Sequence, residues 1–517
     1  VDIISFARNN KIRNIVIPDF FTILPLNCFE ECKSLTHVTL PATLKILPKK
    51  CFKFCTALKK VVLPKKTQKI LDYAFYGCSD LTCVIYKGDI SLIGSYAFSN
   101  CTNLTKFDQN EDDVERILYP DGLFNVKEGV FMNCQSIEKV VFQNGLDQIG
   151  SYSFDSCTKL KEIILNEKID SIEGYAFHNC ISLQKDAIEI LIAGLNNSIS
   201  ECCFKSCLLL ESVRIPDRFE SICASAFEDC SELCEVIIGA NSKLARIESS
   251  VFKSCSKLVS IRIPDSVTSI CTSAFEGCSE LRKVIFGANS KLTMIESAAF
   301  KSCSKLESIN IPNSAELCGS RIFAGCSSLK TAIKIPDATT SIGISAFEGC
   351  SELREVIIGP NSKLTRIESG AFRSCTNLGS FVISEKVVYI GSHAFEMCEG
   401  LREVELRANL RSLKENTFSN CASLREIDIP RSVRSIDSWC FSSCGLERIR
   451  IHNEIEVIGF GCFAHCQKLE KVEFEKDSKL KKVMYYAFFD NSPSLALSLP
   501  ESVKFDNLSE IPNSQEI

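Results

Sequence analysis

Residues 274–286 read AFEGCSELRKVIF, and variants of this phrase recur nearly every 23 residues along the 517-residue chain. In this copy Phe275 is followed by Cys278 at +3, Leu281 at +6 and Val284 at +9. A fixed period of roughly 20 to 50 residues is typical of a solenoid, in which each repeat forms one coil stacked on its neighbours. The repeated phenylalanines number 21: Phe6, Phe29, Phe52, Phe75, Phe98, Phe131, Phe154, Phe177, Phe204, Phe227, Phe252, Phe275, Phe300, Phe323, Phe347, Phe372, Phe395, Phe418, Phe441, Phe463 and Phe488.

Each coil contains one segment that favours a β-strand. Apolar and polar residues alternate before a proline, as in Ile261 to Pro264. This is the period of a half-buried strand, and the proline ends its pairing because it has no N–H to donate. A second buried apolar residue lies at −5, as in Ile270. The segment around the phenylalanine, such as residues 225–231, is too short for a helix, so we expect a turn or a short 3₁₀ segment there.

These features predict one elongated solenoid rather than several globular domains. We expect a single solenoid over 1–517, with an N-terminal capping coil at 1–28 and a C-terminal cap and tail at 488–517. Three places break the rhythm, and one of them is a slight shortening of the coils between Phe418 and Phe463, where Gly445 marks a one-residue deletion. A coil with an acidic loop insertion is expected at 102–130 and an irregular long coil at 181–203, because insertions in repeats form loops.

Composition excludes several classes of function. Hydrophobic residues make up 45% of the chain and charged residues 24%, which is enough to build a core. The net charge of −5 argues against nucleic acid as a partner, since nucleic-acid binding needs a basic face. No apolar stretch approaches the roughly 20 residues of a spanning helix, so we expect no integral membrane segment in this chain.

The 30 cysteines follow the repeat. Position +3 is cysteine in 19 of the 21 modules, which predicts a column of small, buried, reduced side chains. A disulfide framework is the alternative, although it suits small domains that lack a core. The pairs Cys462 with Cys466 and His178 with Cys180 resemble metal-ligand spacings, but both cysteines of the first pair fall on core positions. We therefore expect no metal and no cofactor.

A longer period lies above the first. Residues 225–258 and 273–306 match at 26 of 34 positions, and residues 345–378 form a third copy. Near-identity at outward positions indicates duplication of a two-coil unit. A surface that tolerates such duplication does not suit a fixed catalytic site.

The phrase L-x-x-V-x-I-P, followed by I-x-x-x-A-F-x-x-C, resembles the BspA-like, or treponemal-type, leucine-rich repeat over nearly the whole chain. Residues 225–233, SAFEDCSEL, are similar to the expanded families of parasitic protists. The resemblance implies a curved right-handed stack of about 21 coils, with a parallel β-sheet on the concave face and turns on the convex face. It also implies surface or secreted proteins that bind host proteins or other cells.

The outward strand positions at +8 and +10 are the candidate partner-binding surface. Many coils carry an apolar residue there, which favours protein binding or simply strand propensity. Towards the C-terminal end these positions are charged, which favours a specificity surface or a solubilising face. The apolar residues are Val62, Ile85, Val141, Ile164, Ile237, Ile285, Ile357 and Val382. The charged candidates are Glu403, Glu405, Glu426, Asp428, Arg448 and Arg450.

Two hypotheses about function remain. The first is a non-enzymatic, adhesin-like surface or secreted protein that binds host or cell-surface proteins through the concave face. The second is an intracellular scaffold in the cytoplasm, favoured by the reduced thiols. An enzyme is disfavoured because the five histidines are scattered and no nucleophile–base pair or phosphate-binding loop occurs. No catalytic residue is expected.

Overall fold

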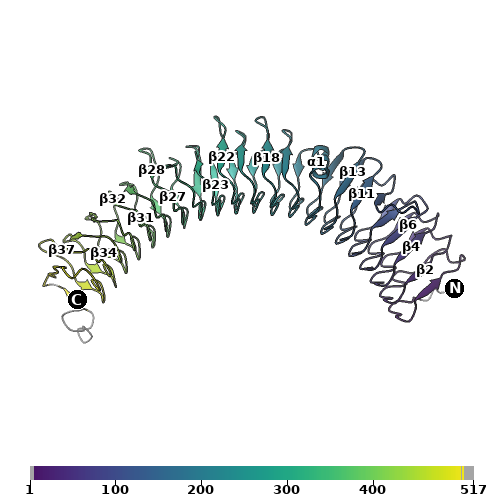
Figure 1. The fold of residues 1–517 in the computed structure, drawn as a ribbon, viewed down its shortest axis with the longest axis horizontal. Helices are drawn as coiled ribbons and strands as arrows, with labels where there is room; N and C mark the ends of the chain where they lie inside the picture. Colours follow the sequence, from purple (N-terminus) through teal and green to yellow (C-terminus); the bar gives the residue numbers. More distant parts are fainter. Residues whose placement is uncertain (1–4, 502, 506–517) are drawn as a thin grey trace. The chain divides into compact units, whose positions relative to one another are not determined.

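The computed structural model describes residues 5–501 and 503–505, arranged in two compact units, Val1–Leu258 and Val259–Ile517. Within each unit the chain forms successive coils of a parallel β-solenoid, with about 20 turns in all and little helix (Figure 1). The predicted solenoid is confirmed. The expectation of one continuous domain with capping coils at both ends stays a prediction.

Each ordinary coil contributes one main strand, at the position the alternating pattern predicts, and the strand pairings between coils in the described residues are all parallel. In the first unit the main strands are β1 (Asn14–Val16), β2 (His37–Thr39), β4 (Lys60–Leu63), β6 (Cys83–Tyr86), β8 (Lys106–Asp108), β9 (Ile117–Tyr119), β11 (Lys139–Phe142), β13 (Glu162–Leu165), β16 (Ser212–Ile215) and β18 (Glu235–Ile238). In the second they are β20 (Ser260–Ile263), β22 (Lys283–Phe286), β24 (Ser308–Ile309), β26 (Ile333–Ile335), β28 (Val356–Ile358), β30 (Ser380–Ile383), β32 (Glu403–Leu406), β35 (Arg448–Ile451) and β37 (Lys471–Phe474).

A second ladder of short strands precedes the phenylalanine of most coils and generally buries an apolar residue near −5; its last strand, β39, follows the final repeated phenylalanine. In the first unit these strands are β3 (Ile46–Leu47), β5 (Lys69–Ile70), β7 (Leu92–Ile93), β10 (Asn125–Val126), β12 (Leu146–Ile149), β14 (Ile169–Ile172), β15 (Ser198–Ile199), β17 (Ser221–Ile222) and β19 (Arg246–Ile247). In the second they are β21 (Ser269–Ile270), β23 (Met294–Glu296), β25 (Glu316–Cys318), β27 (Ser341–Ile342), β29 (Arg366–Ile367), β31 (Tyr389–Ile390), β33 (Ser412–Leu413), β34 (Ser435–Ile436), β36 (Val457–Ile458), β38 (Lys482–Val483) and β39 (Lys504–Phe505).

The expected turn around each phenylalanine is present and has a fixed backbone conformation. The residues two before and two after the ring have positive φ, as at Lys50 (57°) and Phe54 (60°) around Phe52. Few non-glycine residues adopt this left-handed region. The turn brings the N–H groups of Lys50, Phe52 and Phe54 to carbonyls of the next coil at 3.0, 2.7 and 2.7 Å. These hydrogen bonds form a third ladder between coils and offset the conformational cost.

The phenylalanine rings stack in a column through the core. Phe154 lies 5.5 Å from Phe131 and 5.4 Å from Phe177 between ring centroids, with the planes nearly parallel. In the second unit Phe300 and Phe323 stack at 5.5 Å. These rings are fully buried. Every coil therefore presents its neighbour with the same aromatic face, which sets the spacing of the stack.

The cysteines at +3 form a column of hydrogen-bond donors beside the rings. The thiol of Cys180 donates to the carbonyl of Phe154 in the preceding coil at 3.1 Å. The same carbonyl accepts the N–H of Cys157 at 3.1 Å. Burial raises the pKa of these thiols, to about 12 for Cys230, so they stay protonated and able to donate. The cysteines at +3 are all buried, as the sequence predicts, and their reduced state in the cell stays a prediction.

A polar residue ends the thiol column at the last coil. Asn491 occupies the +3 position after Phe488, and its Oδ1 accepts the N–H of Cys466 at 2.8 Å. An amide thus replaces the thiol where the stack meets its final coil. The terminal residues of the expected tail, 502 and 506–517, lie outside the described residues.

One helix replaces a main strand, a feature that the sequence analysis missed. Helix α1 (Lys185–Gly194) lies in the coil predicted to be irregular at 181–203, and it contacts both β13 and β16 (Figure 1). It buries Ile188, Leu191 and Ile192. Their spacing of three and four residues is helical, so the signal was present in the sequence.

The phenylalanine column predicts a large cost for removing one ring. We expect Phe154→Ala to lower the free energy of unfolding by about 3 to 5 kcal/mol, because the neighbouring coils cannot close the cavity. Urea unfolding followed by circular dichroism measures this change, and hydrogen exchange shows whether residues 131–177 open first. The exposed Lys159→Ala in the same coil is the control. A Phe154→Ala variant as stable as the control contradicts the prediction.

The thiol column predicts a sharp division in reactivity. Only Cys83, Cys223, Cys234 and Cys318 are not fully buried, and Cys234 is exposed. At pH 8 we expect a thiol reagent to modify Cys234 first and the other three slowly, since burial raises the pKa of Cys83, Cys223 and Cys318. The remaining thiols should react only after denaturation. Mass spectrometry of the labelled peptides checks this, with Cys234→Ser removing the fast phase.

Candidate functional site

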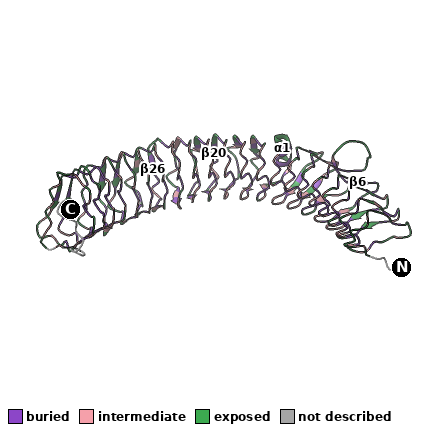
Figure 2. Cartoon of the chain, turned by 60° about the horizontal axis from the view of Figure 1, so that its bottom comes forward, coloured by how far each residue is buried: buried purple, intermediate pink, exposed green. Residues whose placement is uncertain are grey.

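The candidate surface is the set of outward residues on the main strands, here called the main-strand face. In β20 and β35 exposed and buried residues alternate strictly. The side chains that point to solvent are at +8 and +10 in β20 and, because the coil of β35 is one residue shorter, at +7 and +9 in β35. Exposed and buried positions alternate in the same way along most main strands (Figure 2). The sequence therefore placed this face correctly. Its position on the concave side of the coils stays a prediction.

The apolar residues on this face are unequally exposed. Val62, Ile164, Ile357 and Val382 are exposed, with values of 37 to 47%. Ile237 and Ile285 are half-buried, as is Val141. Ile85 was expected to face solvent. This prediction is wrong, because the residue is only 1% exposed. The predicted row is thus interrupted.

The acidic insertion explains why Ile85 is buried. Ile85 is in register with Asp108 on the next strand. Residues 109–115 are exposed, and a wide loop stands out beside β6 (Figure 2). Charged side chains hold the insertion against this part of the face: Arg116 Nε lies 2.7 Å from Asp108 Oδ2, and Lys106 Nζ lies 2.7 Å from Asp112 Oδ1.

The same insertion adds a strand to the main sheet. β8 and β9 are neighbours in one sheet and run parallel, with Phe107 opposite Ile117. The sequence indicated a solvated loop in the coil at 102–130, and the loop is indeed exposed. It did not indicate the extra strand, since a parallel pair normally needs a longer connection.

The charged candidates are all exposed, and four of them form ion pairs, although only Glu426 and Arg448 pair with one another. Arg448 Nε lies 2.9 Å from a carboxylate oxygen of Glu426 in the preceding coil. Arg450 lies 2.9 Å from Glu475 in the next coil. Glu405 accepts two hydrogen bonds from Arg407, at 2.6 and 2.8 Å, and they lower the pKa of the Glu405 carboxyl. Exposed pairs of this kind contribute up to about 1 kcal/mol each, so their value lies in surface chemistry rather than stability.

Two charged candidates stand apart from these pairs. Glu403 and Asp428 are exposed on the same face, and in the described part of the chain neither takes part in an ion pair. The structure therefore brings Glu426 together with Arg448 but leaves Glu403 and Asp428 open to a ligand.

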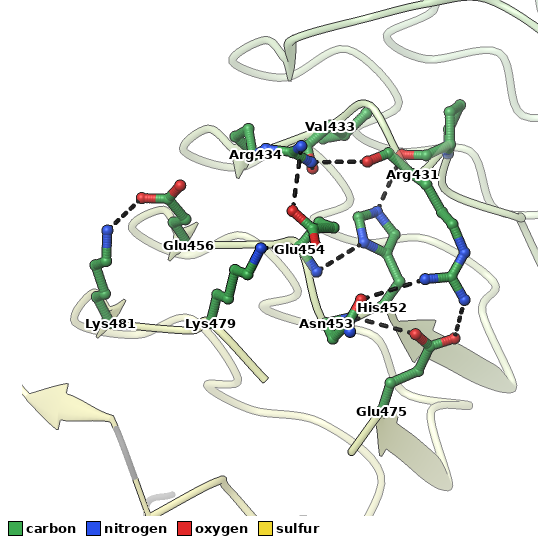
Figure 3. A network of polar contacts seen from close by, with 11 residues as sticks. Arg431, Val433, Arg434, His452, Asn453, Glu454, Glu456, Glu475, Lys479 and Lys481 are labelled. Carbon is green, nitrogen blue, oxygen red and sulfur yellow. Dashed lines mark hydrogen bonds and ion pairs between the residues drawn. The ribbon is translucent and has the colours of Figure 1, made fainter. Parts of the chain in front are cut away.

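A denser polar network lies beside this group, in the loops after the main strands (Figure 3). Glu475 binds Arg431 at 2.9 Å, and Glu454 binds Arg434 at 3.1 Å. At its centre His452 is buried. Its Nε2 lies 3.0 Å from the Pro430 carbonyl, and its Nδ1 accepts the N–H of Glu454 at 3.2 Å. A carbonyl can only accept, so the ring is neutral with its proton on Nε2.

The two metal-like spacings form no metal site. His465 is exposed and lies 2.9 Å from Asp490, whereas Cys462 and Cys466 are buried in the stack. His178 lies 2.8 Å from Asp155, and Cys180 belongs to the thiol column. Over residues 5–501 and 503–505, no group of three or more His, Cys, Asp or Glu side chains is placed to hold a metal. In the same residues no helix is long and apolar enough to cross a membrane.

Sequence reasoning missed an aromatic surface on the turns. In several coils the position two residues before the repeated phenylalanine is a tyrosine. Tyr73 stacks on Tyr96 at 5.3 Å, and Tyr152 stacks on Tyr175 at 4.9 Å, between ring centroids. All four have positive φ. The signal was their constant offset from the repeated phenylalanine.

Sequence reasoning also missed a groove on the main-strand face of the second unit. It holds the predicted residue Ile285 together with Lys283, Asn310 and Lys334, which were not predicted. The groove lies where the coil after Phe323 has one extra residue before its strand, a difference that the sequence displays but that gave no reason to expect a groove.

Parallel strands, repeated turns and a buried core in every coil define the molecule as a leucine-rich-repeat solenoid. The family model described as "BspA type Leucine rich repeat region" matches residues 3–125, 106–198, 197–330, 293–421, 330–447 and 390–509. The chain therefore belongs to the BspA-type leucine-rich repeat family. No curated protein matches its sequence.

Three of the solved structures with similar coils come from bacteria. A leucine-rich repeat protein from Bacteroides ovatus is 20% identical, with a TM-score of 0.41, covering 87% of this chain and 92% of that one. A leucine rich cell surface protein from Faecalibacterium prausnitzii is 23% identical, with a TM-score of 0.28, covering 80% and 87%. The pneumococcal vaccine antigen PcpA is 20% identical, with a TM-score of 0.38, covering 60% and 78%. At such scores these likenesses carry no argument about function.

The neutral state of His452 predicts a dependence of stability on pH. Burial lowers the pKa of His452, so the unfolded chain takes up a proton at about pH 6.5 while the folded chain does not. Its stabilising contribution is present above about pH 6.5 and is lost as the pH falls below that value. We expect the free energy of unfolding to decrease between pH 7 and 5.5, in urea titrations of the C-terminal coils. His452→Gln should flatten this slope, whereas the exposed His37→Gln should not. An unchanged slope in His452→Gln contradicts the prediction.

Proposed function

We propose that this chain is a non-enzymatic protein-binding solenoid, adhesin-like, that binds host or cell-surface proteins through its main-strand face. The proposal places it at the cell surface or outside the cell. Family membership supports a binding role, and the similarity of SAFEDCSEL to protist repeats supports assignment to a protist-type branch. Five histidines on separate coils, including the buried His452, support a role without catalysis.

The observation that carries this proposal is the contrast between the two sides of each main strand. The inward residues repeat from coil to coil, because the stack requires the same shape at every level. The outward residues change: β28 presents Ile357, β32 presents Glu403 and Glu405, and β35 presents Arg448 and Arg450. A rigid face that combines apolar and charged side chains in a non-repeating order can distinguish one protein partner from another.

The intracellular scaffold is the alternative, and one observation favours it. All 30 cysteines are free thiols, most of them buried, which suits a reducing compartment. Biotinylation of intact cells separates the two proposals. Labelling of the protein on intact cells supports the surface role, and labelling only after lysis supports the scaffold.

The binding face is tested by capture of surface proteins with the purified chain. Two main-strand variants are compared with the wild type. The first combines Glu403→Lys, Glu405→Lys, Glu426→Lys and Asp428→Lys, and the second combines Ile357→Ser with Val382→Ser. We expect at least one of the two to abolish capture. Each exposed charge reversal should cost about 1 kcal/mol of stability or less, so the coils remain folded. Circular dichroism checks the fold.

A matched control carries reversals away from the main strands, at Lys159 and Lys257. This control should capture partners as the wild type does. Equal capture by the wild type and by both main-strand variants contradicts the proposed face.

A further inference from the structure

The main sheet of the second unit is open between two neighbouring coils. One described sheet ends at β24, and another begins at β26. At this break Ile333 follows its phenylalanine, Phe323, at +10, whereas Val284 and Ile309 follow theirs at +9. The main sheet is also interrupted between β28 and β30, where the spacing is +9 on both sides. The phenylalanines still stack across this opening, Phe300 on Phe323 at 5.5 Å, so the coils stay together while the strands separate.

A groove of about 640 Å³ lies at this opening, on the main-strand face. Its floor includes Ile285 and Ile311, and its polar walls include Asn310 and Asn313. Asn313 is held in place, because its Oδ1 accepts the N–H of Asp337 at 3.0 Å. The volume lies in the range of ligand sites, and the lining mixes apolar surface with fixed polar groups.

The groove is lined by positive charges that have no ion-pair partner among the described residues. Its lining includes Lys283 and Lys334 and no acidic residue. Three other cations of these coils are paired across the stack at 2.6 to 3.3 Å: Arg282 with Glu307, Lys305 with Glu280 and Lys330 with Glu307. In the described part of the chain, Lys283 and Lys334 form no ion pair. Arg262 lies in register with Ile285 and adds a third cation at the rim.

We propose that this groove binds an acidic, extended peptide segment of a partner protein. Lys283 and Lys334 belong to coils two levels apart, a separation of at least about 10 Å, since paired strands lie about 4.8 Å apart and β24 and β26 are not paired. Carboxylates two to four residues apart on an extended peptide span a similar distance. The amide of Asn310 can bind its main chain, and Ile285 can contact its apolar side chains, whereas the Asn313 amide is occupied by Asp337, to whose Oδ2 its Nδ2 donates at 2.7 Å. The inference rests on the proposed protein-binding function and names the chemistry of the segment that is bound.

The duplicated coils supply a test variant with little risk to the fold. The positions equivalent to Lys283 in the two other copies are Glu235 and Glu355. Lys283→Glu therefore installs a residue that the chain already uses at this site. Lys334→Asn likewise installs the residue type of Asn310 in the preceding coil. The control is Lys60→Glu with Lys69→Asn, two exposed lysines of the first unit with the same change in charge.

The experiment is fluorescence anisotropy with the full chain. The probe is a fluorescein-labelled dodecapeptide of alternating glutamate and threonine, and its counterpart has glutamine in place of glutamate. We expect the wild type and the control to bind the glutamate peptide more tightly than the glutamine peptide, with an affinity that falls as salt rises. The double groove variant should bind the glutamate peptide about tenfold more weakly, the effect of losing two exposed charge contacts.

Each outcome decides the inference. Equal binding of the two peptides by the wild type overturns it, as does a groove variant that binds like the control. Equal competition by inorganic polyphosphate assigns the site to any polyanion and overturns the peptide assignment. The proposed function is judged separately: capture lost in the Ile357 and Val382 variant, with no peptide binding, supports the main-strand face and rejects the groove. Peptide binding at the groove, with no loss of capture in either main-strand variant, supports the groove and rejects the capture of surface proteins by the mutated main-strand residues.

Discussion

Stacking of one phenylalanine on the next is the interaction on which the rest of the structure depends. Each ring lies about 5.5 Å from its neighbour. The backbone carbonyl of the same phenylalanine joins two coils, because it accepts a hydrogen bond from the cysteine thiol of the coil that follows. A larger side chain than cysteine would separate the coils, and a smaller one would leave that carbonyl without its second donor. The repeated phrase therefore describes one spacing element, made of a ring, a turn and a thiol, that has to recur at every level.

This constraint divides the residues of each coil into two sets. Inward residues are restricted because an error at one level disturbs both neighbours. Outward residues on the main strands are free to vary, and they do: apolar at Val382, acidic at Glu403, basic at Arg448. Chemistry that recognises a partner belongs to the second set. Many of its charges are already paired across coils, so the unpaired ones, such as Glu403, Asp428, Lys283 and Lys334, are the more informative.

The sequence predicted the repeating parts well, because each is a local pattern with a single physical explanation. The main strands, the turns and the buried thiols were all located from spacing. Departures from the repeat were predicted less well. Helix α1 was expected as irregular chain, although Ile188, Leu191 and Ile192 have helical spacing, and Ile85 was expected on the surface. In both cases a neighbouring coil decides the outcome. Helix α1 packs beside the strands of the adjacent coils, and Ile85 is covered by the charged insertion of the next coil.

By itself the sequence determined the coil, its period and the inward or outward direction of most side chains, since these follow from periodicity and from the need to bury one face of each repeat. The tertiary structure alone decided which residues meet across coils. It placed Arg448 beside Glu426, enclosed His452 as a neutral ring, and opened the sheet between β24 and β26. Such contacts depend on small differences in spacing between successive coils, and a difference of one residue acquires meaning only when the coils are stacked.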